Sequence, residues 1–264
     1  MARWSNAPVV YVIGQVRFSP VLSLSSYLPT IQEQFRKNGF PVFAQRFNFQ
    51  LGLSLNLPEG ASQPPQIPVE RLPAYVFSNR DSSQTFILEA SALTFHVSDY
   101  EDFEWFLNRF LDPLNGIVKL IAPDLSERIG LRYVDVVIPR DGSAVQEYLV
   151  PEVLGLPQAR FSGTLVHSFS ESVFSHGEGT TVIRVFSGRG QLALPPDLAF
   201  SPVTVKPTIT GFDGPHAIID TDSFLAARSE MNLSSIRDTF NNLHENLREA
   251  LRSVSTEFAI SEWK

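Results

Sequence analysis

The residues of this sequence that are best suited to binding a ligand are arginines in two similar β-branched runs. Arg17 stands near the end of the run Val9–Phe18, and Arg132 stands inside the run at 129–138. In both runs an aromatic residue follows the arginine directly, and a proline follows the run or closes it. A guanidinium group forms two parallel hydrogen bonds with a phosphate or a carboxylate, so arginines at matching places could converge on one anion.

Arg46 and Arg184, which also lie in predicted strands, complete the predicted ligand-binding set. An internal ion pair is the alternative for each arginine. For Arg132 the candidate partners in such a pair are Asp135 and Glu127. Sequence spacing alone does not decide between anion binding and an internal pair.

Acidic side chains give a weaker signal. Glu89 and His96 fall seven residues apart in one predicted strand, so alternation places them on opposite faces and argues against an acid–base pair. Asp220 and Asp222 share a strand face and, with Glu89, could hold a divalent cation through oxygen ligands. Nothing else in the sequence supports a metal, and we predict no metal ligands.

Motifs of known chemistry are missing. The spacing of His167, His176 and His216 matches no zinc motif, and His244 is expected to make one hydrogen bond at a packing interface. The sequence has no cysteine, no phosphate-binding loop, no dinucleotide fingerprint and no nucleophile elbow. We therefore predict no catalytic residues and no cofactor.

Composition narrows the class of protein. A formal net charge of −7 argues against nucleic-acid binding, which requires clustered lysine and arginine to neutralise phosphates. The first residues lack the apolar region of a signal peptide, and no apolar run reaches the roughly 18 residues that span a bilayer. With cysteine absent, we expect a cytoplasmic protein that does not enter the membrane.

Apolar periodicity places these residues on elements that come in two similar sets. The first set is a strand, a helix, three strands and a helix, expected at Val9–Phe18, Leu24–Lys37, 41–55, 74–79, 85–96 and after a capping box at 98–101. Pro113 is expected to end or kink that last helix. The proline-rich residues 57–73 are expected to form an exposed loop.

The same order is predicted again after a short apolar linker at 116–124. Its elements are expected at 129–138, 144–154, 163–174, 180–186, 203–209, 216–224 and 234–254. The helix at 234–254 has the clearest pattern, because its apolar residues form one continuous stripe.

This repetition predicts an α+β fold of two internally duplicated β-α-β-β-β-α units, with antiparallel sheets covered by the long helices. The units are residues 1–115 and 116–264, packed as one body, because the apolar linker is unsuited to a flexible tether. A duplicated body has a groove or a shared sheet where its halves join, which is a natural place for a partner to bind.

Three short motifs carry a resemblance to a known family: PVV and VRF within residues 8–18, RIGLRY at 128–133, and the last helix with the apolar tail 258–263. With these motifs the chain resembles an uncharacterised family of sporadically distributed bacterial proteins, over nearly its whole length. That family has no assigned activity, catalytic residues or cofactor, so the resemblance implies no site residues. Its patchy distribution implies an accessory role, as in defence or toxin–antitoxin systems.

The leading hypothesis is a non-enzymatic binding or interaction protein that recognises a protein partner or a small-molecule ligand. A homodimer is also a possible assembly, because the apolar tail 258–263 could pack either on its own body or on a second copy of the chain. The alternative is an enzyme or sensor that binds a phosphorylated small molecule through the four arginines, with Glu89 or Asp222 holding a metal. Clustered exposed apolar residues favour the first hypothesis, and a deep pocket lined by arginines and acids favours the second.

Overall fold

The structure, a computed structural model, describes residues 6–51, 69–140, 142–156, 160–199 and 201–264. Within these residues ten strands form one antiparallel sheet that is accompanied by six α-helices. The strands are β1 (Val9–Phe18), β2 (Val42–Leu51), β3 (Val69–Ser78), β4 (Gln84–Glu89), β5 (Ala92–Val97), β6 (Leu125–Val137), β7 (His167–His176), β8 (Gly179–Gln191), β9 (Asp213–Leu225) and β10 (Ser229–Glu230). The helices are α1 (Leu24–Lys37), α2 (Phe103–Ile121), α3 (Val145–Tyr148), α4 (Pro207–Thr210), α5 (Leu233–Val254) and α6 (Glu257–Trp263), with 3-10 helices η1 (Pro151–Val153) and η3 (Pro196–Leu198).

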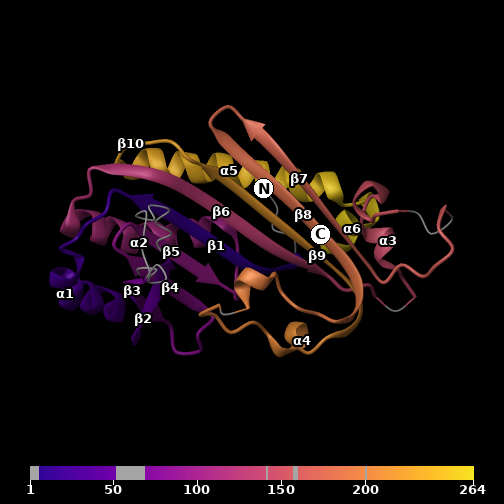
Figure 1. The fold of residues 1–264 in the computed structure, drawn as a ribbon, viewed down its shortest axis with the longest axis horizontal. Helices are drawn as coiled ribbons and strands as arrows, with labels where there is room; N and C mark the ends of the chain where they lie inside the picture. Colours follow the sequence, from indigo (N-terminus) through magenta and orange to yellow (C-terminus); the bar gives the residue numbers. More distant parts are fainter. Residues whose placement is uncertain (1–5, 52–68, 141, 157–159, 200) are drawn as a thin grey trace, which may run out of the picture.

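The strand order is β2-β3-β4-β5-β1-β6-β9-β8-β7, and β10 pairs with one end of β6. Strand β1 pairs with β6 in the middle of this order. Strands from both halves of the chain therefore lie in one continuous sheet (Figure 1). The predicted α+β class with a large antiparallel sheet is confirmed.

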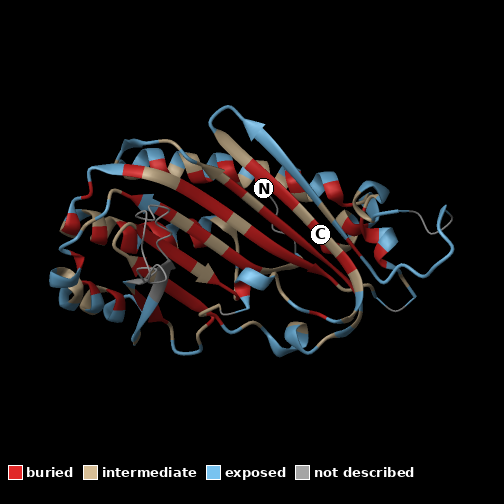
Figure 2. Ribbon diagram, viewed as in Figure 1, coloured by how far each residue is buried: buried red, intermediate tan, exposed pale blue. Residues whose placement is uncertain are grey.

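One face of the sheet, the helix face, packs against α1, α2 and α5 through the largest buried apolar cluster. Phenylalanines link the layers: Phe86 and Phe95 stack with ring centroids 4.1 Å apart, and Phe110 of α2 lies parallel to both. In Figure 1, α2 and α5 lie behind the sheet. Figure 2 shows buried residues concentrated in the central strands.

The opposite face, turned toward the viewer in Figure 1, is called the front face. A smaller apolar cluster lies at one end of it, where Tyr11, Val134 and Ile218 contact Leu198 and Val203 from the connection between β8 and β9. Because side chains alternate along each strand, the polar residues described below reach the front face from the same strands that build the core.

The strand Val9–Phe18 and the helix Leu24–Lys37 were predicted with the bounds that the structure shows. The prediction of a single strand at 85–96 is wrong, because these residues form the hairpin of β4 and β5. The turn at Ala90 and Ser91 contains neither glycine nor proline, so no turn signal marked it.

The predicted start of the second long helix is also wrong, and Pro113 does not end this helix. Asp102 caps α2 by accepting a hydrogen bond from the Trp105 N–H at 2.8 Å, whereas Ser98 donates to the carbonyl of Thr204 at 2.7 Å. Pro113 lies inside α2, and the helix takes in much of the predicted linker at 116–124. Burial of the apolar residues on both sides of Pro113 outweighs the hydrogen bond that proline removes.

Two predictions in proline-rich segments need correction. Strand β3 takes in the last five residues of the predicted loop 57–73. Pro73 lies where β3 pairs with β2 and not with β4, and proline is tolerated in strands at such edge positions. Residues 57–68 of that loop lie outside the described residues. The strand predicted at 203–209 is absent, and α4 begins there with Pro207 at its first position.

The apolar tail 258–263 packs on its own body as part of α6. Ala259 and Trp263 join a buried cluster with Tyr148 of α3. The rings of Tyr148 and Phe258 lie edge to face with their centroids 5.1 Å apart. The tail is therefore engaged inside the molecule and is a poor candidate for a dimer contact.

Gly14 provides a test of how closely α2 packs on the sheet. A Cβ atom at this position of β1 would stand 2.9 Å from Cζ of Phe106 and 3.5 Å from the ring of Phe240. We predict that Gly14→Ala lowers the free energy of unfolding by about 1–3 kcal/mol through overpacking, measured by urea denaturation. A variant as stable as the wild type would contradict this packing.

Candidate functional site

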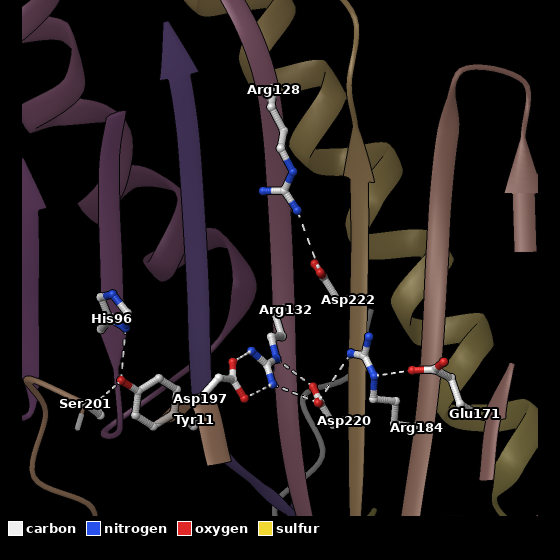
Figure 3. Close-up of polar contacts among 10 residues, drawn as sticks. All are labelled: Tyr11, His96, Arg128, Arg132, Glu171, Arg184, Asp197, Ser201, Asp220 and Asp222. Carbon is white, nitrogen blue, oxygen red and sulfur yellow. Dashed lines mark hydrogen bonds and ion pairs between the residues drawn. The ribbon is translucent and has the colours of Figure 1, made fainter. Parts of the chain in front are cut away.

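A row of charged side chains crosses the front face from β6 to β7 (Figure 3). Arg132 donates from Nε and Nη2 to the two carboxylate oxygens of Asp220, at 2.7 and 2.8 Å. Arg132 also pairs with Asp197 of η3. Nη1 of Arg184 lies 3.7 Å from Asp220, and its Nε donates to Glu171 at 2.6 Å. Positive and negative groups alternate along the row, and each of its two arginines is paired with carboxylates that belong to the row.

The centre of this row is buried. The Arg132 and Asp220 side chains are 15% and 6% exposed. Burial lowers the pKa of Arg132, but its hydrogen bonds to Asp220 and Asp197 outweigh burial and raise that pKa overall. The bond from Arg132 likewise lowers the pKa of Asp197. The strand register causes the arrangement, because Asp220 pairs with Arg184 on one side and with Val134 on the other.

A second pair lies further along the same strands. Nη2 of Arg128 is 3.7 Å from Asp222, and its guanidinium lies over the Phe224 ring, 4.5 Å from the centroid. Arg128 also donates to Oε1 of Gln15 at 3.1 Å. Burial lowers the pKa of Arg128, and the nearby Arg17 lowers it further. Burial raises the pKa of Asp222 despite its arginine neighbours.

Tyr11 connects the charged row to the apolar end of the front face. Its hydroxyl lies 3.0 Å from Nδ1 of His96 and forms a hydrogen bond with Ser201 (Figure 3). Burial raises the pKa of Tyr11 to about 12. Burial, and secondarily Arg132, lowers the pKa of His96 to about 4. Both groups are therefore neutral at pH 7 and act as hydrogen-bonding groups.

The structure brings together only part of the predicted arginine set. Arg132 and Arg184 share Asp220. Arg17 of β1 lies opposite Arg128 of β6 in the strand register. Arg128 is four residues from Arg132 along β6, so Arg17 lies about 13 Å along the sheet from the level of Arg132. Arg46 is exposed on β2, four strands from β1 and so roughly 19 Å away. Anion binding by these residues stays a prediction.

The alternative partners named for Arg132 are wrong. Asp135 lies on the helix face, because it stands three positions after Arg132 along β6 and successive side chains of a strand point to opposite faces. Glu127 pairs with Arg228 at 3.2 Å. The partner is instead Asp220, 88 residues further along the chain.

The acidic and histidine predictions have mixed outcomes. Glu89 and His96 lie on different strands of the β4–β5 hairpin, and the register places both side chains on the front face. The prediction that they lie on opposite faces of one strand is therefore wrong. Asp220 and Asp222 do share a face, where each has an arginine neighbour. Among the described residues no three His, Asp or Glu side chains gather closely enough to hold a metal.

A cavity of about 610 Å³ lies on the helix face, between the start of α2 and the later turns of α5. Asp135 of β6 lines it, and only 3% of this residue is exposed. Within the described residues, the Asp135 carboxyl has no hydrogen bond or ion pair. An unpaired buried carboxylate is costly. Burial, and secondarily Asp220 on the other side of the sheet, raises the pKa of Asp135 to about 7.

One wall of the cavity is a network of aromatic residues. The hydroxyl of Tyr133 lies 3.1 Å from that of Tyr100 and 3.2 Å from Nδ1 of His244. The His244 ring stacks on Phe103 with centroids 3.9 Å apart. Burial, and secondarily Arg248, lowers the pKa of His244 to about 4, so this imidazole is neutral. The expectation of a hydrogen-bonded histidine at a packing interface agrees with this geometry.

Sequence reasoning overlooked the cavity, although β6 carried a signal for it. Tyr133, Asp135 and Val137 occupy alternate positions, and the tyrosine and valine face the buried side. An aspartate at an inward position of a strand is unusual, because charged residues are rarely fully buried without a partner. The opposite partner of Asp135 in the sheet, Ile219, offers no compensating charge.

Comparison of the chain with protein-family models and with curated proteins gives no match.

We predict that Arg132→Ala destabilises the protein by about 3–5 kcal/mol, because Asp220 stays buried with only the more distant Arg184 nearby. Chemical denaturation measures the change. Arg36→Ala is the matched control, because Arg36 makes a similar two-bond pair with Glu33 at the surface and should matter little. Equal effects of the two variants would contradict the buried pair.

We predict that Asp135→Asn stabilises the protein by roughly 2–3 kcal/mol more at pH 8 than at pH 5. The folded state keeps the Asp135 proton up to about pH 7, whereas an unfolded aspartate loses it near pH 4. Wild-type stability therefore falls as pH rises through this window, and asparagine removes the loss. His244 titrates in both proteins and cancels in the comparison. Melting curves of both proteins across pH 5–8 test this, and a uniform loss of stability would contradict it.

Proposed function

We propose that this protein is a non-enzymatic interaction protein, and that the edge strand β7 is where a second chain adds a strand. The observation that carries the proposal is a cluster of exposed apolar residues. In the described residues, seven of the thirteen exposed large apolar side chains fall within 156–174, namely Leu156, Phe161, Leu165, Val166, Phe169, Val173 and Phe174. Exposed apolar groups concentrated in one place are typical of interaction sites.

The position of β7 supports strand addition. Among the described strands, β7 ends the strand order and pairs only with β8, so within these residues its other edge presents backbone N–H and C=O groups without a strand partner. Natural edges are usually protected by charged residues, prolines or short length. β7 has ten residues with no proline, and its one acidic residue, Glu171, is turned toward Arg184. Such an edge suits β-augmentation.

The pattern of β7 favours a second copy of this chain as the partner. An antiparallel pair centred on Phe169 places the two Phe169 rings opposite each other and sets Glu171 opposite His167 of the second copy. Apolar groups then meet apolar groups, and the carboxylate meets an imidazole that can donate a hydrogen bond. The resulting dimer joins two sheets into one.

We also propose that the two halves arose by duplication. β1 and β6, the first strands of each half, pair antiparallel about a local two-fold arrangement. In each half a later strand, β5 or β9, pairs with that first strand, and in the second half the short strand β10, which also pairs with β6, follows β9 before the long helix. The helices α2 and α5 follow these strands and join the same core. Each half contains five strands: β4 and β5 of the first half replace one predicted strand, and the fifth strand of the second half is the two-residue β10.

A cytoplasmic location and an accessory role in a bacterial defence or toxin–antitoxin system remain part of the proposal, supported by the absence of cysteine and by the family resemblance. In the described part of the chain, no helix has the length and apolar character needed to cross a membrane. The phosphorylated-ligand alternative is less favoured, because Arg132 and Arg184 are engaged by carboxylates.

We predict that the wild-type protein is a dimer by native mass spectrometry and that Phe169→Lys makes it a monomer. Lysine at this position would place two ammonium groups opposite each other in the proposed pair. Phe47→Lys is the matched control, because Phe47 is also an exposed phenylalanine on an edge strand, β2, at the other end of the sheet. A monomeric wild type, or a dimer that survives Phe169→Lys, would overturn the β7 interface.

A further inference from the structure

The cavity on the helix face has the size of a small-molecule site and is independent of the β7 edge. Its volume of about 610 Å³ falls in the range of ligand pockets. Apolar parts of Val9, Leu247 and Leu251 contribute to its walls. Its most unusual feature is the carboxyl of Asp135, 3% exposed and without a partner among the described residues.

The α2 side of the cavity adds negative charge. Glu101, Asp102 and Glu104 line this side. Asp102 is committed to capping α2 through the Trp105 N–H, so the helix N-terminus is already occupied by a carboxylate. An anionic ligand would meet these acids as well as Asp135, which argues against a phosphate or carboxylate ligand at this site.

The α5 side does not offset that charge. Arg248 donates from Nη1 to both oxygens of Glu245, at 2.8 and 2.9 Å, which satisfies much of its charge within α5. Arg252 also lines the cavity, and His244 is neutral at pH 7. Two arginines thus face four glutamate or aspartate side chains beside Asp135, and the lining is acidic in total.

Aromatic rings in the cavity wall also favour the binding of a cation. Tyr100, Phe103 and Tyr133 line the cavity together with His244. The faces of phenol and phenyl rings attract cations, most strongly where water is excluded. The Tyr133 hydroxyl is held between Tyr100 and His244, so the wall is fixed before a ligand arrives.

We propose that this cavity binds a small organic cation, a protonated amine with an apolar body, whose ammonium group forms an ion pair with Asp135. The ammonium supplies the charge partner that the described residues do not provide, and the apolar body occupies the space between α2 and α5. Binding favours the ionised carboxylate and so displaces the Asp135 proton near neutral pH, since its pKa is raised to about 7. Affinity should therefore increase between pH 6 and pH 8.

Calorimetric titration with 2-phenylethylammonium tests the proposal, with 2-phenylethanol and 3-phenylpropionate as its neutral and anionic counterparts. We expect saturable binding of the ammonium only, with proton release at pH 7 seen as a dependence of the heat on the buffer. Asp135→Asn should weaken binding at least about tenfold while keeping or raising thermal stability. Asp213→Asn, the same change at an exposed position of β9, should leave binding unchanged.

Three results would overturn the proposal. They are the absence of saturable ammonium binding at millimolar concentration, equal binding by wild type and Asp135→Asn, and preferential binding of 3-phenylpropionate. Because the readout is ligand binding and not assembly, a failure here leaves the β7 interface standing, and a failure of the β7 interface leaves the cavity standing.

Discussion

The antiparallel pairing of β1 with β6 is the constraint on which the rest of the structure depends. It joins the two halves of the chain into one sheet and fixes which residue of each strand points to which face. Once Arg132 faces front, alternation sends Tyr133 and Asp135 to the helix face. A one-residue slip would exchange these faces and bury the guanidinium in the phenylalanine core. The ion-pair row and the cavity are thus two results of one register.

Local pattern predicted the elements whose signals are strong and self-contained. The strand Val9–Phe18, the helix Leu24–Lys37 and the stripe of α5 needed no information from distant residues. Errors arose where tertiary contacts overruled local signals. Pro113 reads as a helix end but lies within α2, because buried neighbours on both sides hold the helix together. The β4–β5 turn could not be predicted from the sequence, because it contains neither glycine nor proline.

The site was harder to predict for a related reason. Arginine chemistry marked Arg132 and Arg184 as binding groups, yet whether they hold a ligand or a carboxylate is decided by Asp220, which lies on β9 and is brought between them only by the sheet. Asp135 was named in the sequence only as a partner for Arg132. Its actual place beneath α5 depends on strand register and helix packing, neither of which spacing along one strand reveals.

The central position of the β1–β6 pair also shapes how the chain folds during synthesis. About a hundred residues separate β1 from β6, so one side of β1 stays open until β6 has emerged from the ribosome. The core of the first half remains only partly enclosed until α5 is synthesised, because α5 contributes to that core and follows the strands of the second half in the chain. Pairings of such long range close slowly. The nascent chain is therefore expected to depend on chaperones more than a protein of the same size built from local hairpins.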